Sequence, residues 1–94
     1  MKITYTEEAV ADIVSALTYL AERSPAAAAK LDAAIQQCID RLAAQEFDGP
    51  ESRLKSGTQV RSWPVPPFRV YYQRLSNEFL IVRVYHQARR PIAR

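Results

Sequence analysis

The fold is decided by the stretch from Phe79 to Ile92, which reads FLIVRVYHQARRPI. Its first eight residues are rich in β-branched and aromatic side chains, as is typical of a central strand. Strict alternation along this strand predicts a dry face formed by Leu80, Val82 and Val84. The strand runs directly into His86, Arg89 and Arg90. We therefore expect the functional side chains to follow the most rigid element of the chain.

The size and composition indicate one domain over residues 1–94. A chain of 94 residues can bury one core but not two. Its hydrophobic content of 48% and charged content of 24% are ordinary for a globular protein, and no apolar run reaches the roughly 20 residues of a membrane helix. The N-terminus has no apolar signal-peptide region and Cys38 is the single cysteine, so we expect a cytoplasmic protein without membrane contact.

Positive charge is concentrated in the second half of the chain. Residues 1–50 contain four Lys or Arg against eight Asp or Glu, whereas residues 51–94 contain nine against two, and eight of those nine are Arg. Arginine binds phosphate and carboxylate groups in a bidentate manner, so this half suits nucleic acid or an acidic protein partner. The charge alone fits a solvated polar surface equally well.

Two helices are expected after a short first strand at Lys2 to Tyr5. Thr6 is a candidate N-cap for a helix that ends near residue 23, and Ser24 followed by proline marks a second helix that runs to about residue 44. Spacings of three and four predict one apolar stripe on each helix. The stripes are Val10, Ile13, Val14, Leu17 and Leu20 on the first helix, and Leu31, Ile35, Cys38, Ile39 and Leu42 on the second.

Three further strands are expected at residues 59–65, 68–75 and 79–85. The segment 46–58 holds both glycines and is expected to be an irregular connection. Prolines cannot donate a hydrogen bond to a ladder. The strand 59–65 contains Pro64 and is followed by two more prolines, so it should lie at the edge of the sheet or end there.

These elements predict an α+β fold of two layers in the order β-α-α-β-β-β. The two apolar stripes can be buried only against one face of the sheet, so the helical hairpin packs there. If the proline-containing strand is one edge and the first strand pairs with the last, the antiparallel sheet has the order 1-4-3-2. The face turned away from the helices then carries Arg69, Tyr71, Arg83 and Tyr85.

Three segments of the chain carry a recognisable pattern: A-x-x-D-I with a later Y-L in Ala9–Leu20, P-F-R-V-Y-Y at Pro67–Tyr72, and V-R-V-Y-H-Q-A-R-R-P at Val82–Pro91. In this order they resemble the ParE branch of the RelE/ParE superfamily of bacterial toxins. The resemblance implies a RelE-like fold and a small cytoplasmic toxin of the plasmid-stabilisation type. It also implies neutralisation by a ParD-like antitoxin, and contact with DNA only through that antitoxin.

The resemblance leaves two targets open. ParE-type members poison DNA gyrase, whereas RelE-type relatives cleave messenger RNA on the ribosome. Cleavage by 2′-hydroxyl attack needs a general base, a proton donor and a cation near the phosphate. The candidate catalytic residues are Arg69, His86 and Tyr85. Gln87 stands where some ribonuclease members have a tyrosine, and alternation puts His86 opposite Arg69, so we expect a toxin that binds and not an enzyme.

A toxin that binds needs exposed cations, and the candidates are Arg69, Arg83, Arg89, Arg90 and Arg94. Trp63 is a candidate antitoxin contact, with packing at the core or the sheet edge as the alternative. An antitoxin helix is expected in a groove by the helical hairpin, with an extended tail at a free sheet edge. A third interpretation is a non-toxic member that represses its own operon with the antitoxin. No residue spacing resembles a metal site or a glycine-rich phosphate loop, so no cofactor is expected.

Overall fold

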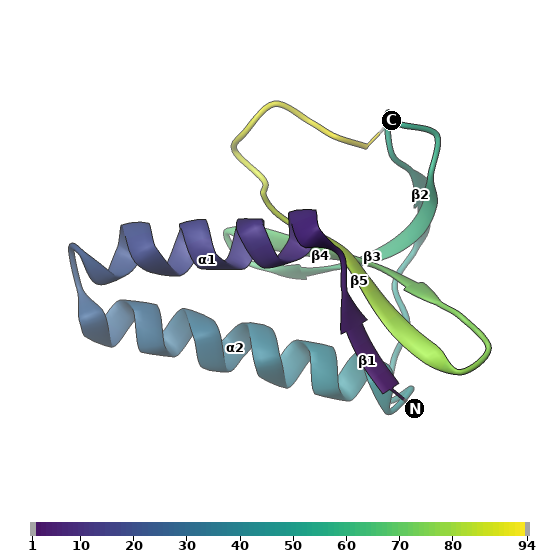
Figure 1. Ribbon diagram of the computed structural model, residues 1–94, viewed down its shortest axis with the longest axis horizontal. Helices are drawn as coiled ribbons and strands as arrows, with labels where there is room; N and C mark the ends of the chain where they lie inside the picture. The colour runs from purple at the N-terminus through teal and green to yellow at the C-terminus, as the bar shows by residue number, and fades with distance from the viewer. Residues whose placement is uncertain (1, 94) are drawn as a thin grey trace.

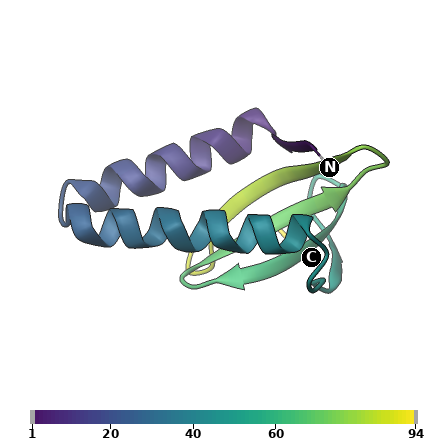
Figure 2. The ribbon, with the colours of Figure 1, turned by 90° about the horizontal axis from the view of Figure 1, so that it is seen from below.

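The computed structural model describes residues 2–93 and contains two helices packed on a five-stranded sheet. Strand β1 (Lys2–Tyr5) precedes helices α1 (Glu7–Ala21) and α2 (Pro25–Ala43). The remaining strands are β2 (Glu51–Arg53), β3 (Gln59–Val65), β4 (Phe68–Arg74) and β5 (Glu78–His86). Both helices cover the same face of the sheet, and their joined ends extend past it (Figures 1 and 2). The predicted two-layer α+β fold is confirmed.

Both helices begin at the predicted N-caps. The Thr6 hydroxyl accepts a hydrogen bond from the first turn of α1 at 3.0 Å and donates one to the Val82 carbonyl at 2.7 Å. The Thr6 backbone N–H also donates to the carbonyl of Ile81 at 3.0 Å, so the start of α1 is attached to β5. Ser24 accepts a hydrogen bond from the first turn of α2 at 3.2 Å, and Pro25 takes a first-turn position where its missing N–H costs nothing.

The sheet has the order β1-β5-β4-β3-β2, which differs from the prediction in two respects. The expected 1-4-3-2 arrangement is present, but Glu51–Arg53, predicted to be irregular, adds an edge strand beside β3. Strand β1 pairs with β5 in the parallel sense, so the sheet is mixed and not antiparallel. A tight turn imposes antiparallel pairing only on consecutive strands, and β1 and β5 lie at opposite ends of the sequence.

The proline-containing strand β3 is not the edge of the sheet, but it ends at Val65, directly before Pro66 and Pro67, as the alternative form of the prediction stated. Strand β2 pairs only with Gln59–Arg61, however, and Pro64 lies beyond the end of that pairing. No strand lies on the outer side of β3 at Pro64, so its missing N–H leaves no ladder hydrogen bond unmade. The proline thus has the same local surroundings as it would have at a sheet edge.

A β-bulge interrupts the most central pairing. The register of β4 and β5 shifts between Tyr71, which pairs with Arg83, and Tyr72, which pairs with Ile81. Val82 is thus an extra residue in β5, and the alternation of side chains reverses there. The core residues of this strand are Phe79, Ile81 and Val84, with 0%, 0% and 1% exposure. The predicted dry face is therefore wrong at positions 80 and 82 and right at 84.

The two helices contribute unequally to the core. In α2 the residues Ile35, Cys38, Ile39 and Leu42 are buried, as predicted. In α1 only Ala9 is buried, and Ile13 packs against the core from a partly exposed position. The predicted stripe on α1 is wrong at Val10 and Val14, which are 48% and 56% exposed, because the helix turns a narrower side towards α2 and β5.

The face of the sheet turned away from the helices carries a second, smaller core. Its buried residues are Leu54, Val60 and Tyr71, and Val82, Tyr85 and Ile92 pack against them. Residues 87–93 cross this face as an arch that begins at the end of β5 and returns to the segment after β2 (Figure 1). We call this segment the C-terminal arch. The Lys55 N–H donates to the Ile92 carbonyl at 2.6 Å, and Leu54 forms a bridge with Ala93, so the arch is fixed at its far end.

Candidate functional site

A groove of about 1010 Å³ lies on the helix side of the molecule. It lies between the two helices, the turn from β3 to β4, the end of β5 and the beginning of the C-terminal arch. Its apolar lining includes Leu20, Leu31, Pro66, Pro67, Phe68 and Val84. These residues come from segments far apart in the sequence, and the part of the helical hairpin that extends past the sheet leaves them uncovered. The groove has the apolar lining of a recognition site for a peptide or a helix.

Three charged residues line this groove: Asp12, Lys30 and Arg89. Asp12 is bound to Arg83, whose guanidinium donates to the carboxylate at 2.7 and 2.9 Å. Lys30 and Arg89 are exposed, and neither has an ion-pair partner within residues 2–93. The charge left for a ligand in the groove is therefore positive.

His86 also lines the groove, at the end of β5. Its ring meets Phe68 edge to face, with centroids 5.0 Å apart, and its Nδ1 accepts a hydrogen bond from the Ala88 N–H at 3.0 Å. The carbonyl of His86 accepts the N–H of Arg89 at 3.1 Å. These contacts make His86 the first turn of the arch as well as part of the groove wall.

Arg69, another candidate catalytic residue, lies on the opposite face of the sheet. It pairs with Tyr85 across the strands, and its Nε donates to the hydroxyl of buried Ser62 at 2.8 Å. No carboxylate within the described chain pairs with Arg69. Tyr85 packs on the smaller core beneath the C-terminal arch and also contributes to the lining of the groove. The sheet therefore separates Arg69 from His86.

Arg83 is engaged internally. The hydrogen bond to Asp12 raises the pKa of Arg83 above its ordinary value, although burial opposes this. Its guanidinium also lies 5.1 Å from the centre of the Tyr85 ring. With side-chain exposures of 26% for Arg83 and 14% for Asp12, the pair closes the edge of β5 beyond the end of β1. Arg83 is consequently not an open cation of the outer face.

The cations of the C-terminal arch are exposed. Arg89 and Arg90 both reach solvent, and Arg89 alone of the two lines the groove. Arg94 lies outside the described residues. Trp63 is remote from this region: its ring packs on Phe47, with centroids 4.4 Å apart, and it contacts the main core.

A polar cluster that the sequence did not reveal surrounds Asp48, in the connection between α2 and β2. The buried Tyr72 hydroxyl donates to Asp48 and accepts the Gly49 N–H at 2.8 Å. Burial opposes ionisation of Asp48, but this hydrogen bond and the charges of Arg74 and Arg61 outweigh it and lower the pKa of Asp48. Burial and the same hydrogen bond raise the pKa of Tyr72. A Cβ on Gly49 would lie 1.8 Å from the Ser62 carbonyl oxygen, so only glycine fits there.

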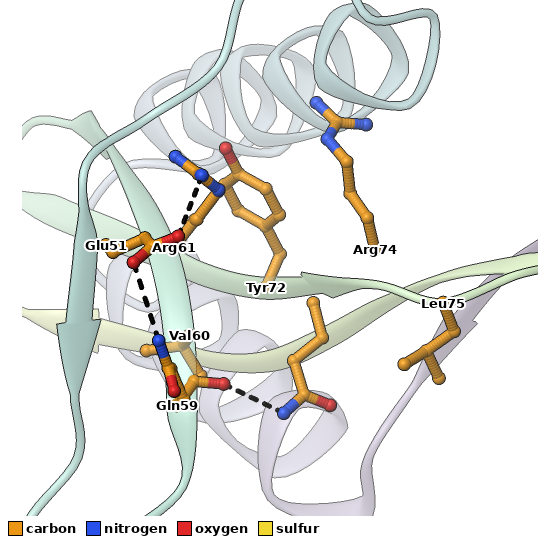
Figure 3. A pocket seen from close by; sticks show the side chains of 8 residues that line it. Glu51, Gln59, Val60, Arg61, Tyr72, Arg74 and Leu75 are labelled. Carbon is orange, nitrogen blue, oxygen red and sulfur yellow. Dashed lines mark hydrogen bonds and ion pairs between the residues drawn. The ribbon is translucent and has the colours of Figure 1, made fainter.

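A small pocket of about 260 Å³ lies beside this cluster, over β3 and β4 (Figure 3). Arg61 and Arg74 point into the region, but their charges are balanced by acidic neighbours. Arg61 pairs with Glu51 at 3.0 Å and with Asp48 at 3.5 Å, and Arg74 pairs with Asp48 at 3.4 Å. The pocket is thus part of a structural network and has no net charge to attract an anion.

No group of three His, Cys, Asp or Glu side chains within residues 2–93 is arranged to hold a metal ion. Neither helix in that range is long and apolar enough to cross a membrane.

Comparison with known proteins decides the family. Residues 3–91 match the family model described as the ParE toxin of the type II toxin–antitoxin system parDE. The chain belongs to this family. The resemblance inferred from the sequence is therefore confirmed, and the chain is the toxin component of a type II toxin–antitoxin system. Membership of the ParE family implies an antitoxin as its partner.

A solved structure supports the same fold for this ParE-family toxin. A chain of the chromosomal ParDE TA system from P. aeruginosa superposes with a TM-score of 0.73 at 22% sequence identity. The match covers 92% of this chain and 95% of that chain. No protein in a curated collection matches this sequence significantly.

Two parts of the site have no direct signal in the sequence. Lys30 is a lone lysine on an alanine-rich helix and has no distinguishing spacing. Asp12 belongs to the A-x-x-D-I pattern. Its position one turn after the helix start, between apolar neighbours, could have indicated a partner on the sheet, but the partner is 71 residues away in the sequence.

Proposed function

We propose that this ParE-family toxin acts by binding DNA gyrase through the arginines of its C-terminal arch, and that a ParD-like antitoxin neutralises it by placing a helix in the groove. In this proposal the chain carries out no bond-breaking step of its own. It traps a larger enzyme in an inactive complex.

The division of Arg69 and His86 between the two faces of the sheet is the observation that carries the proposal. An endoribonuclease of the RelE type must bring a base, an acid and a phosphate-binding cation to the same few ångströms of substrate. Here the candidate base faces the groove and the candidate cation faces away. His86 Nδ1 is also occupied as an acceptor for the Ala88 N–H. This arrangement favours recognition over RNA cleavage.

The cations of the arch support a binding role. Arg89 and Arg90 are exposed on a segment that is tied down at both ends, so little conformational freedom remains to be lost on binding. Their guanidinium groups suit phosphate or carboxylate on a large partner. Arg83, by contrast, already has its carboxylate and contributes to the fold.

The groove supports the neutralisation half of the proposal. An α-helix with its side chains is about 10–12 Å across, and a volume of 1010 Å³ accommodates about two turns of one. An amphipathic helix that buries its apolar face on Leu20, Leu31 and Phe68 would use a recognition mode common to helix-in-groove complexes. Trp63 packs on Phe47 away from the groove and has no part in this proposal.

The proposal is tested with purified chain and purified gyrase in a supercoiling assay that also detects cleaved DNA complexes. The wild-type chain should inhibit supercoiling and accumulate cleaved DNA, and Arg90→Ala should weaken both effects about tenfold, as loss of one well-placed charge does. Arg53→Ala removes an exposed arginine of β2 and serves as the matched control, with activity within about twofold of wild type. Unimpaired supercoiling at a large excess of the chain would reject the proposal.

A parallel assay separates the two alternatives. Added to translating ribosomes, the chain should leave messenger RNA intact. Cleavage within the decoding site that is abolished by His86→Ala would replace the gyrase proposal with an endoribonuclease. If expression without antitoxin fails to arrest growth at all, the chain is a non-toxic member whose role lies in the antitoxin complex.

A further inference from the structure

We propose that Lys30 and Arg89 select the antitoxin by pairing with carboxylates on the flanks of its groove-bound helix, and that this contact withdraws Arg89 from the target. The inference rests on the proposed function, because it assumes an antitoxin helix in the groove and a target on the arch. It specifies the charge of the antitoxin helix and explains how binding of that helix prevents Arg89 from contacting the target.

The charge of the groove specifies the partner. Of the three charged residues that line it, Asp12 is neutralised by Arg83, which leaves Lys30 and Arg89 without partners in the described chain. A helix with an apolar face and neutral or basic flanks would leave two cations partly desolvated at the rim. A helix with Asp or Glu on both flanks would pair them, since opposite charge across a rim gives specificity and a faster encounter.

The two cations lie on separate walls of the groove. Lys30 belongs to α2, whereas Arg89 belongs to the arch that follows β5. Because the two cations come from different elements on either side of the groove-bound helix, we expect the partner to carry acidic residues on both sides of its apolar stripe.

Arg89 cannot move out of the groove wall easily. The Gln87 N–H donates to the Pro67 carbonyl at 2.9 Å, and the Arg89 N–H donates to His86 at 3.1 Å. At the other end, Ile92 is held by Lys55. The backbone that carries Arg89 is thus fixed at the junction between groove and arch. A helix that fills the groove must cover this residue.

Arg90 provides the contrast within the same segment. It is the next residue, it is exposed, and it is not among the residues that line the groove. If the antitoxin and the target contacted the same side of the arch, Arg89 and Arg90 would contribute equally to the binding of both partners. If the groove-bound helix covers only the junction, Arg89 serves two partners and Arg90 serves one.

The test measures the affinity of each variant for the full-length antitoxin encoded beside the chain. Lys30→Glu and Arg89→Glu should each weaken binding about tenfold or more, because reversal replaces an attraction with a repulsion. Arg90→Glu should change it by less than about threefold. The wild-type affinity should fall as salt is raised from about 0.05 to 0.5 M, and the two groove variants should lose part of that salt dependence.

Growth assays supply the second measurement. Lys30→Glu should remain toxic and should arrest growth even when the antitoxin is co-expressed, because only neutralisation is impaired. Arg90→Glu should lose toxicity and still bind antitoxin, and Arg89→Glu should lose both. Arg89→Gln, which removes the charge but keeps an unbranched polar side chain, and the urea midpoint of every variant identify any loss that is due to misfolding.

Failure of the inference is distinguishable from failure of the proposed function. Equal antitoxin affinities for Arg89→Glu and Arg90→Glu in folded proteins would overturn the inference, whatever gyrase does. An antitoxin that retains wild-type affinity after its C-terminal Asp and Glu are changed to Asn and Gln would overturn it as well. If the wild-type chain does not inhibit gyrase, the proposed target is wrong. The antitoxin affinities of the variants would still test the inference independently.

Discussion

Arg83 donates two hydrogen bonds to the Asp12 carboxylate, at 2.7 Å from Nε and 2.9 Å from Nη2. The same carboxylate accepts the backbone N–H of Val84 at 3.0 Å. Strand β1 pairs with β5 only as far as Ile81, so on that side β5 has no neighbouring strand at Val84, although β4 pairs with it on the other side. A side chain of α1 therefore continues the ladder that β1 begins, and the arginine links α1 to β5.

Replacing Asp12 with Ala should lower the free energy of unfolding by about 2–4 kcal/mol, because it leaves a partly buried guanidinium and a strand N–H without their acceptor. Urea denaturation measures the change. Asp32→Ala, at an exposed position of α2, is the control and should cost no more than about 0.5 kcal/mol. The double change Asp12→Leu with Arg83→Met should cost less than Asp12→Ala alone. Equal costs for the Asp12 and Asp32 variants would contradict the role assigned to the pair.

Replacing Tyr72 with Phe should cost about 1–3 kcal/mol. The side chain is fully buried, and its hydroxyl joins Asp48 to the Gly49 N–H, so both groups would lose a partner. Tyr71→Phe is a matched control on the same strand, since the Tyr71 hydroxyl makes no hydrogen bond within the described residues. A Tyr72 variant as stable as the Tyr71 variant would argue against the network.

Acid should destabilise the chain through Asp48. Its pKa is lower in the folded protein than the ordinary value of 3.8, so its contribution to stability is complete above pH 3.8 and is lost as the pH falls towards the folded-state value. Because the side chain is 44% exposed, the contribution is expected to be about 1 kcal/mol or less. Unfolding measured between pH 5 and pH 2 should show a shallower loss for Asp48→Asn than for wild type. Identical slopes would show that Asp48 is not a source of the acid sensitivity.

Replacing Ile92 with Ala should release the far end of the C-terminal arch. Ile92 packs on the smaller core and is only half-buried, so the cost in global stability should stay near 1 kcal/mol. Hydrogen exchange of the Lys55 amide, which donates to the Ile92 carbonyl, should accelerate, and growth arrest should weaken to the level of Arg90→Ala. Val14→Ala, a change at an exposed position of α1, should affect neither measurement. Full toxicity together with rapid exchange at Lys55 would show that toxicity does not depend on an ordered arch.

The features that the sequence predicted correctly are local ones. The N-caps at Thr6 and Ser24 and the apolar stripe of α2 depend on residues three or four apart, and the structure contains them. The features that escaped prediction depend on distant partners. Neither the bulge at Val82 nor the pairing of Asp12 with Arg83 has a signal within a short window, because each is set by the strand or helix on the other side.

The features of the functional surfaces also divide into those that the sequence predicted and those that it did not. Placement of His86 and Arg69 on opposite faces followed from the sequence, and the structure agrees even though the bulge reverses the alternation between Ile81 and Arg83. The groove did not follow, because it is assembled from both helices, a turn and the C-terminal arch. A surface built from four separate segments has no spacing that a single sequence can reveal.

Val82 divides β5 into two halves with different surroundings. Before it, Phe79 and Ile81 are buried in the larger core, and β1 pairs with the strand as far as Ile81. After it, Val84 is still buried, but Arg83 binds Asp12 and His86 lines the groove. One added residue thus lets a single uninterrupted strand serve both the interior and the groove wall.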